Sequence, residues 1–194
     1  MVDWARKHLD GLTDAVQDDI DVGNPEMDQD HHALAQLIEK VGGVCGDALK
    51  SGCKCDQCPE GKPQRCFDAL IEIAHEIMVR MLEHFEREDE LMQSLPRTRA
   101  TREHCMAHRR EHVDFSTRYN LALAHINARH PVIGLRILGT FILDWIRSHI
   151  LEYDIKLAVL LKESLRQADS GGYLPPRNVT SYSNPRNVGT QLKS

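Results

Sequence analysis

The sequence predicts an all-α protein: an up-down antiparallel four-helix bundle with an N-terminal helical extension and a flexible C-terminal tail. Three observations predict this class. Apolar residues recur at helical spacing along most of the chain, without a convincing alternating strand pattern. Segments containing glycine or proline interrupt this pattern and divide it into four long stretches. The connections between most of these stretches are short, which is typical of antiparallel neighbours in a bundle.

Composition divides the chain into three parts. Residues 1–18 are predicted to form a short amphipathic extension and residues 19–167 the bundle. Residues 168–194 are polar and rich in Gly, Pro, Ser and Asn, which predicts a flexible tail. The tail repeats the tetrapeptide PRNV at Pro176–Val179 and Pro185–Val188. We interpret this repeat either as a docking motif for a protein partner or as the remnant of a linker.

Start and stop signals place the four helices. The first is expected to begin near Asp28, a plausible N-cap, because Gly23, Asn24 and Pro25 should break a helix, and to run to the glycines at 42–46. The fourth is expected to begin at Pro131, since proline is favoured in a first turn. The second helix is expected at about 64–93 and the third at about 97–128. The fourth is expected to run over about 131–167.

Charge and hydropathy exclude several classes of function. The net charge of −5 gives no basic surface for nucleic acid, and no apolar run approaches the ~18 residues of a membrane span. The N-terminal residues lack the apolar region of a secretory signal, so a cytoplasmic location is expected. Histidine is abundant, with eleven residues beside only four Phe and two Trp. This imbalance directs attention to metal binding.

Each predicted helix carries histidines or carboxylates that could bind a metal. They lie in MDQDHHAL (Asp28, His31), in HFERE (His84, Glu88), in a stripe at four-residue spacing (His104, His108, His112) and in WIRSHILEYD (His149, Asp154). Residues four apart share one face of a helix. If two histidines are taken from the stripe, the set holds five imidazoles, with Glu88 and Asp154 as two carboxylates. These are too many donors for one tetrahedral zinc, whereas two octahedral metals bridged by carboxylates would use them all. Nitrogen and oxygen donors suit iron or manganese, and zinc is a further option.

The spacing of His149 and Asp154 is unusual for a helix. Five residues at about 100° each leave the two side chains roughly 140° apart. This spacing predicts that His149 binds one metal ion while Asp154 reaches across to bridge toward a second. Other histidines, such as His75, are interpreted singly as surface or core residues, as are His8, His125 and His130. Glu72 and His75 form one Glu-x-x-His pair of the ferritin-like type, and that architecture requires a second pair.

Taken together, the four ordered motifs resemble those of the hemerythrin family, specifically the bacterial type, bacteriohemerythrin. The resemblance covers about residues 19–161. VGNPEMDQDH matches the opening pattern and HFEREDELM the second, with Asp89 in place of a second glutamate. HRREHVDF and WIRSHILEYD match the third and fourth patterns. The gap between the second and third motifs is about one helical turn longer than usual, which leaves His104/His108 as a rival register that would lose the match at Phe115.

The resemblance implies an oxo- or hydroxo-bridged pair of iron ions that binds dioxygen reversibly. By this resemblance His108, His112 and His149 bind one iron, His31 and His84 bind the other, and Glu88 and Asp154 bridge them. The two-histidine iron keeps an open position for dioxygen. We therefore predict an oxygen-binding protein for storage, delivery or sensing. The alternatives are a di-iron oxidase, peroxidase or nitric-oxide-handling enzyme, or a regulatory module that uses the cysteine-rich loop.

A cysteine-rich insertion separates the first two helices. Five of the six cysteines fall within about residues 45–66: Cys45, Cys53, Cys55, Cys58 and Cys66. These thiols are close enough in sequence for a zinc site or an iron–sulfur cluster. Two other interpretations stay open. One is a set of redox-active thiols, since a cytoplasmic setting disfavours permanent disulfides, and the other is an insertion with inert, reduced cysteines.

Overall fold

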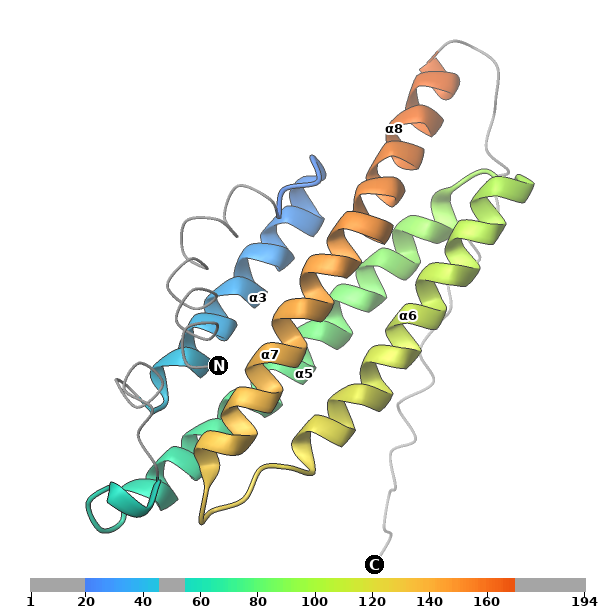
Figure 1. Ribbon diagram of the computed structural model, residues 1–194. Coiled ribbons are helices and arrows are strands. Elements are labelled where there is room, and N and C mark those ends of the chain that lie inside the picture. The colour runs from blue at the N-terminus through green and yellow to red at the C-terminus, as the bar shows by residue number, and fades with distance from the viewer. Residues whose placement is uncertain (1–19, 46–54, 170–194) are drawn as a thin grey trace, which may run out of the picture.

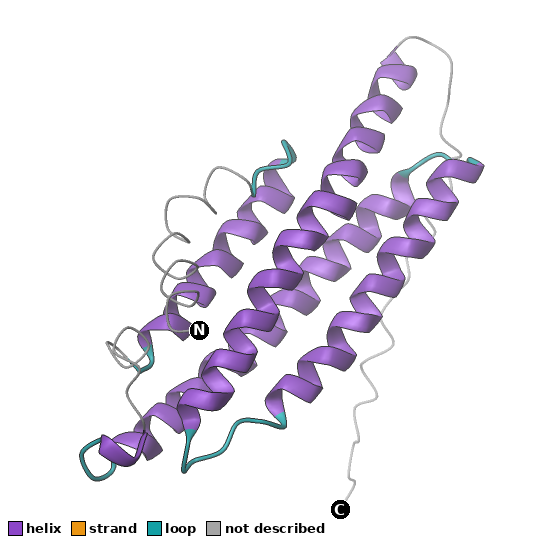
Figure 2. Ribbon diagram, in the orientation of Figure 1, coloured by secondary structure: helices purple, strands orange, loops and turns teal. Residues whose placement is uncertain are grey.

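A computed structural model describes residues 20–45 and 55–169 of the chain, and within them all regular structure is helical. The elements are α3 (Pro25–Gly43), the short turn η1 (Cys55–Gln57), α5 (Lys62–Ser94), α6 (Arg99–Leu123), α7 (Pro131–His149), the π-helical turn η2 (Ile150–Asp154) and α8 (Ile155–Asp169). α7, η2 and α8 follow one another without a break, so that the described residues build four rods that run alternately up and down (Figures 1 and 2). The predicted four-helix bundle is confirmed.

The first helix begins three residues earlier than predicted. Asn24 is its N-cap and accepts hydrogen bonds from the backbone N–H groups of Glu26 and Met27, while Pro25 occupies the first turn. Asp28, the predicted cap, instead accepts the N–H of Val22 at 2.7 Å. The residues expected to break a helix therefore start one, because a proline without an N–H fits the first turn, where no intrahelical partner is needed.

The third helix is shorter than predicted at both ends. α6 begins after Thr98, which forms a reciprocal capping box with Thr101, and it ends at Leu123 instead of about residue 128. Beyond its end, the Asn127 side chain accepts hydrogen bonds from the N–H groups of Arg129 and His130. Asparagine competes with helical hydrogen bonds in this way and favours a turn.

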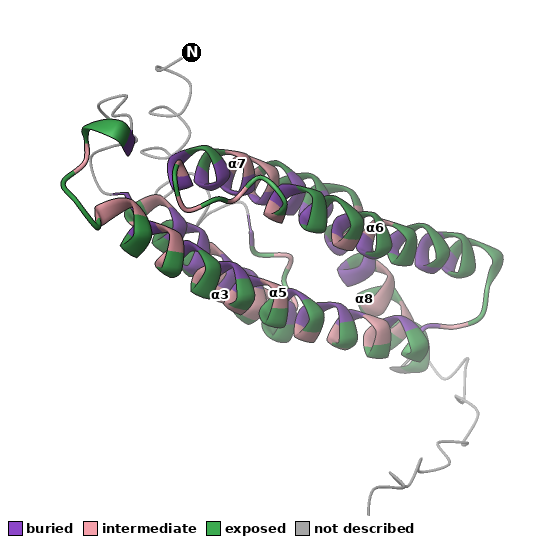
Figure 3. Cartoon of the chain, turned by 90° about the horizontal axis from the view of Figure 1, so that it is seen from below, coloured by how far each residue is buried: buried purple, intermediate pink, exposed green. Residues whose placement is uncertain are grey.

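The core lies between the four rods, where the buried faces of the helices meet (Figure 3). Leu70, Ile77 and Leu138 are fully buried in it. Tyr119, also fully buried, donates its hydroxyl to the carbonyl of Ala74 and so joins α6 to α5. Burial raises the pKa of this hydroxyl, which keeps it a donor at neutral pH.

The fourth rod contains a widened turn that a regular helix lacks. In η2 the N–H of Ile155 bonds to the carbonyl of Ile150, a spacing of five residues instead of four. Residues five apart therefore return to the same face, and the angle of roughly 140° expected for a regular helix does not apply. The prediction of a continuous α-helix over 131–167 was wrong at this turn, which separates His149 from Asp154.

Parts of the sequence prediction fall outside the described residues. These are the N-terminal extension, Cys53 and the PRNV repeat. Within residues 20–45 and 55–169, no helix has both the length and the apolar character needed to cross a membrane.

Candidate metal centre

Seven polar side chains from all four rods lie buried together inside the bundle. Each exposes 7% or less of its surface, although all seven are of ionisable residue types. They are His31 of α3, His84 and Glu88 of α5, His108 and His112 of α6, His149 at the end of α7 and Asp154 at the end of η2. Burying so many ionisable groups costs free energy unless they are paired or bind a metal.

The donor atoms form two overlapping groups. In the first, one donor atom from Glu88 and one from each of three histidines, His108, His112 and His149, all lie within 4.8 Å of one another. In the second, His84, Glu88, His149 and Asp154 meet the same limit. His31 joins this side, since its Nε2 lies 3.1 Å from Asp154 Oδ2. The groups share Glu88 and His149, so the centre is larger than one ion requires.

Asp154 faces both sides of the centre with different oxygens. Its Oδ1 lies 3.2 Å from His108 Nε2 and 3.1 Å from His149 Nε2, while its Oδ2 faces His31. The π-helical turn makes the contact with His149 available, because it brings Asp154 to the same face as His149. A carboxylate with its oxygens divided in this way has the arrangement of a bridging ligand.

The histidine stripe of α6 enters the centre with two of its three members. His112 Nε2 lies 3.0 Å and His108 Nε2 3.4 Å from Glu88 Oε2. His104 is buried one turn away, its ring centroid 5.4 Å from that of His108, and its Nε2 has no hydrogen-bond partner within the described residues. Burial lowers the pKa of His104 to about 4, so its ring is neutral at pH 7.

The contacts within the centre fit a bound cation better than a hydrogen-bond network. His149 Nε2 lies 3.0 Å from His108 Nε2 and 3.4 Å from His112 Nε2, although a neutral imidazole has a single N–H to share. Neither oxygen of Glu88 has a hydrogen bond of good geometry among the described residues, despite imidazoles at 3.0–3.6 Å. Donors bound to one metal at about 2.1 Å lie about 3.0–3.4 Å apart. The lone pairs therefore converge as metal ligands do.

The local electrostatics keep both carboxylates ionised. Burial alone would raise the pKa of Glu88, but His84 and the imidazoles of α6 and α7 hold it well below its usual range. The pKa of Asp154 is also lowered, by His149 and His108, against burial and the charge of Glu88. These two negative charges in a buried site attract cations.

Contacts outside the centre orient the imidazoles. The Nδ1 of His31 lies 2.7 Å from the carbonyl of Ile20, which fixes the ring with Nε2 toward Asp154. The Nδ1 of His84 lies 3.5 Å from a carboxylate oxygen of Asp30, and Arg87 holds that carboxylate with two hydrogen bonds. Carboxylates placed behind ligand histidines in this way fix the ring and raise its basicity.

Aromatic rings pack against two of the histidines. Phe85 stacks on His112 with ring centroids 3.9 Å apart, and Trp145 stacks on His149 at 4.2 Å. Phe85 also meets Trp145 edge to face. One side of the centre is therefore enclosed by apolar surface, which restricts the rotation of both imidazoles.

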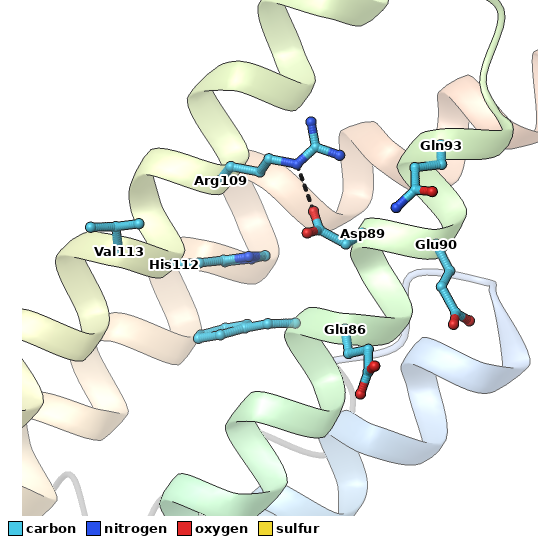
Figure 4. Close-up of a pocket in the computed structure, with 8 residues that line it drawn as sticks. Glu86, Asp89, Glu90, Gln93, Arg109, His112 and Val113 are labelled. Atoms are coloured by element: carbon cyan, nitrogen blue, oxygen red, sulfur yellow. Dashed lines mark hydrogen bonds and ion pairs between the residues drawn. The ribbon is translucent and has the colours of Figure 1, made fainter. Parts of the chain in front are cut away.

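A pocket of about 610 Å³ approaches the centre from the groove between α5 and α6 (Figure 4). His112 lines it together with Phe85, and an ion pair between Arg109 and Asp89 spans it at 2.7 Å. Its other lining residues are Glu86, Glu90, Gln93 and Val113. The pocket brings solvent to the edge of the buried centre at His112.

The remaining predicted sites lie apart from this centre. Cys45, Cys55, Cys58 and Cys66 lie near the start of α5, and Cys53 is outside the described residues. Glu72 and His75, the ferritin-like pair, are both exposed. Sequence reasoning missed Asp30 and Arg87. The available signal was their place beside ligand motifs, since Asp30 precedes His31 and Arg87 precedes Glu88.

Fold and site together define a helical-bundle protein with a buried histidine–carboxylate cation centre. The hemerythrin HHE cation-binding domain matches residues 22–160, which is most of the sequence, and the chain belongs to this family. Comparisons with curated proteins and with solved structures found no match. The family and the buried cluster agree that this protein binds metal cations.

Proposed function

We propose that the chain is a non-haem di-iron protein that binds dioxygen reversibly. The observation that carries the proposal is that the two carboxylate oxygens of Asp154 face different histidines. One oxygen lies toward His31, and the other lies toward His108 and His149. Such a carboxylate serves two ions at once. Imidazole and carboxylate donors without thiolate suit iron.

The proposed ligands fall into two sets. His108, His112 and His149 hold one iron, and His31 and His84 hold the other, with Glu88 and Asp154 bridging. The second set contributes one protein donor fewer than the first. When bound, the iron pair supplies the electrons that reversible dioxygen binding requires. Five neutral imidazoles against two carboxylates favour the reduced state of the pair, which suits reversible binding better than oxidation of a substrate.

The surrounding residues support a binding role in three ways. The low exposure of the seven side chains keeps bulk water from the centre. The aromatic rings of Phe85 and Trp145 hold His112 and His149 in place. The pocket beside His112 offers a small molecule a route inward, past the Arg109–Asp89 pair. Together these features exclude water while admitting a small ligand.

The proposal is tested by reducing the purified protein without air, measuring its iron and admitting air while the visible spectrum is recorded. We expect about two iron ions per chain and a coloured adduct that bleaches under argon. Irreversible conversion to a ferric spectrum with consumption of oxygen would instead indicate an oxidase. A protein that contains another metal and no iron would contradict the di-iron assignment.

Removal of the carboxylate behind His84 should weaken metal binding without abolishing it. We expect Asp30→Ala to lower iron affinity by about 10- to 100-fold, because His84 loses the partner that orients its ring. Iron retention during titration with a chelator measures the effect. The matched control is Asp21→Ala, since Asp21 pairs with the partly exposed His32 at 2.9 Å. Equal retention by both variants would show that Asp30 does not support the centre.

A further inference from the structure

The pocket between α5 and α6 lies where the buried metal centre comes nearest to solvent. Six of the seven side chains of the centre expose 2% or less of their surface, whereas His112 exposes 7%. His112 is also the one member of the seven that lines this pocket. A cation that reaches the centre from solvent has to pass a layer of protein, and this layer is least complete at His112.

The centre is covered more fully on its other sides. Toward α3, Asp30 and Arg87 form an ion pair directly behind His84. Toward α7, the indole ring of Trp145 stacks on His149 with ring centroids 4.2 Å apart. These contacts leave the gap between α5 and α6 as the most direct approach among the described residues.

The pocket is lined by more negative than positive charge. Glu86, Asp89 and Glu90 of α5 contribute three carboxylates, and Arg109 of α6 contributes one guanidinium group. Figure 4 shows Asp89 and Arg109 meeting across the gap, while the exposed Glu86 and Glu90 point away from His112 at its outer edge. A cleft lined by one sign of charge attracts ions of the opposite sign and raises the rate at which they arrive. This pocket should therefore draw cations toward the centre.

The carboxylates of the pocket are not arranged to keep a cation. Among the described residues, donor atoms converge as metal ligands do only in the two groups of the histidine–carboxylate centre. Neither group includes Glu86, Asp89 or Glu90. Side chains that attract an ion without enclosing it define a route to a binding site, and they do not form a second site.

An ion pair crosses this route. Arg109 Nε donates to Asp89 Oδ1 at 2.7 Å and so links α6 to α5. The two side chains expose 45% and 42% of their surfaces, and an ion pair as exposed as this one is weak because water competes for both partners. While the pair is formed, the guanidinium group places a positive charge in the path of an incoming cation. Separation of the pair moves this charge aside and frees the Asp89 carboxylate.

The inner end of the route meets a residue that serves the whole centre. His112 Nε2 lies 3.0 Å from Glu88 Oε2, and Glu88 belongs to both donor groups. Phe85 stacks on the His112 ring at 3.9 Å, so that the ring forms the inner wall of the pocket together with an apolar neighbour. A cation received by His112 and Glu88 is therefore within reach of either group.

We propose that the pocket between α5 and α6 is the entry route by which divalent cations load the buried centre. Glu86 and Glu90 attract the cation at the outer edge, the Arg109–Asp89 pair limits its passage, and His112 is the first ligand that it meets. The proposal concerns any divalent cation that the centre binds, and it does not depend on dioxygen binding.

The first test measures how fast the metal-free, full-length protein takes up Co²⁺. Uptake can be followed by quenching of tryptophan fluorescence, because Trp145 lies against His149. We expect the double variant Glu86→Gln/Glu90→Gln to take up Co²⁺ about tenfold more slowly at low salt, and at nearly the unaltered rate in about 1 M salt. The final amount of bound Co²⁺ should not change, because neither residue is a ligand.

The matched control for these charges is Glu72→Gln/Glu163→Gln. Glu72 of α5 and Glu163 of α8 are exposed and lie outside the pocket, so this variant loses the same charge elsewhere on the bundle. Its uptake rate should stay close to that of the unaltered protein. Equal rates in the two double variants would overturn the proposal. A lower final Co²⁺ content in Glu86→Gln/Glu90→Gln would also overturn it, since these residues would then be ligands.

The second test changes the ion pair and includes a measurement on the metal-loaded protein. Arg109→Gln should take up Co²⁺ several-fold faster, and should also release it faster to an uncharged chelator, since entry and exit use the same path. Arg110→Gln is the control, because Arg110 is the exposed neighbour of Arg109 and does not line the pocket. Unchanged or slower uptake and release in Arg109→Gln would contradict the proposed role of the pair. A protein that loads Co²⁺ as expected but forms no reversible dioxygen adduct with iron would contradict the proposed function alone.

Discussion

Asp154→Ala should lose iron from both positions of the metal centre. The two oxygens of Asp154 face different histidines, so the variant removes a ligand from each proposed ion. Loss of an outer-shell partner of a metal ligand already costs about 10- to 100-fold in affinity, and loss of a shared ligand should cost more. Elemental analysis should therefore find iron well below one ion per chain. Glu88→Ala is expected to behave in the same way, because Glu88 belongs to both donor groups.

Thermal unfolding offers an independent check on Asp154→Ala. A metal that binds only the folded state stabilises it by about 2.7 kcal/mol when present at 100 times its dissociation constant. The unaltered protein should therefore melt at a lower temperature after its metal is removed, while Asp154→Ala should show little further change. His32→Ala is the control, since this neighbour of His31 is partly exposed and pairs with Asp21 instead. Two iron ions per chain in Asp154→Ala would disprove the bridging assignment.

The register of α6 should be decided by two single substitutions in its histidine stripe. His112→Ala is expected to lose most of the iron, because His112 Nε2 lies 3.0 Å from Glu88 Oε2 within the first donor group. His104→Ala should keep the iron, because His104 is outside both groups. Removing its buried ring should nonetheless lower the melting temperature through the cavity it leaves.

Iron content and thermal unfolding together distinguish a packing role from a ligand role for His104 and His112. Iron retained with a lower melting temperature identifies a packing role, while iron lost identifies a ligand. The reverse result, with iron lost in His104→Ala and kept in His112→Ala, would establish the alternative register. In that register His104 and His108 would be the ligands, and Phe115 would no longer match the family pattern.

The helices could be predicted from the sequence because their buried residues recur at helical spacing. Their ends were harder to place, since one short segment can carry opposite signals. Gly23 and Pro25 both suggest a break, yet Asn24 between them caps α3. The outcome depends on whether a helix follows, and local residue preferences alone do not decide this.

In the metal centre, the features set by spacing within one helix could be predicted from the sequence, and the contacts between helices could not. The spacing of His84 and Glu88 places both on one face of α5, and this follows from helical geometry alone. The support that Asp30 gives to His84 joins residues from α3 and α5, and becomes visible only when these helices pack together. The π-helical turn has no residue preference that announces it. Its one sign was the five-residue interval between His149 and Asp154, which we had attributed to the reach of the aspartate.

The π-helical turn also affects how this part of the chain can change in length. In a regular helix the loss of one residue rotates every later side chain by about 100° and ruins the fit of a buried face. At η2 the chain already holds one residue more than a regular turn, so a deletion there can be absorbed by reversion to an α-helical turn. A protein lacking the exposed Glu152 should fold and melt cooperatively, whereas one lacking the exposed Arg136 should not. The turn therefore allows an evolving sequence to add or lose a residue beside its metal ligands while the rest of the rod keeps its alignment.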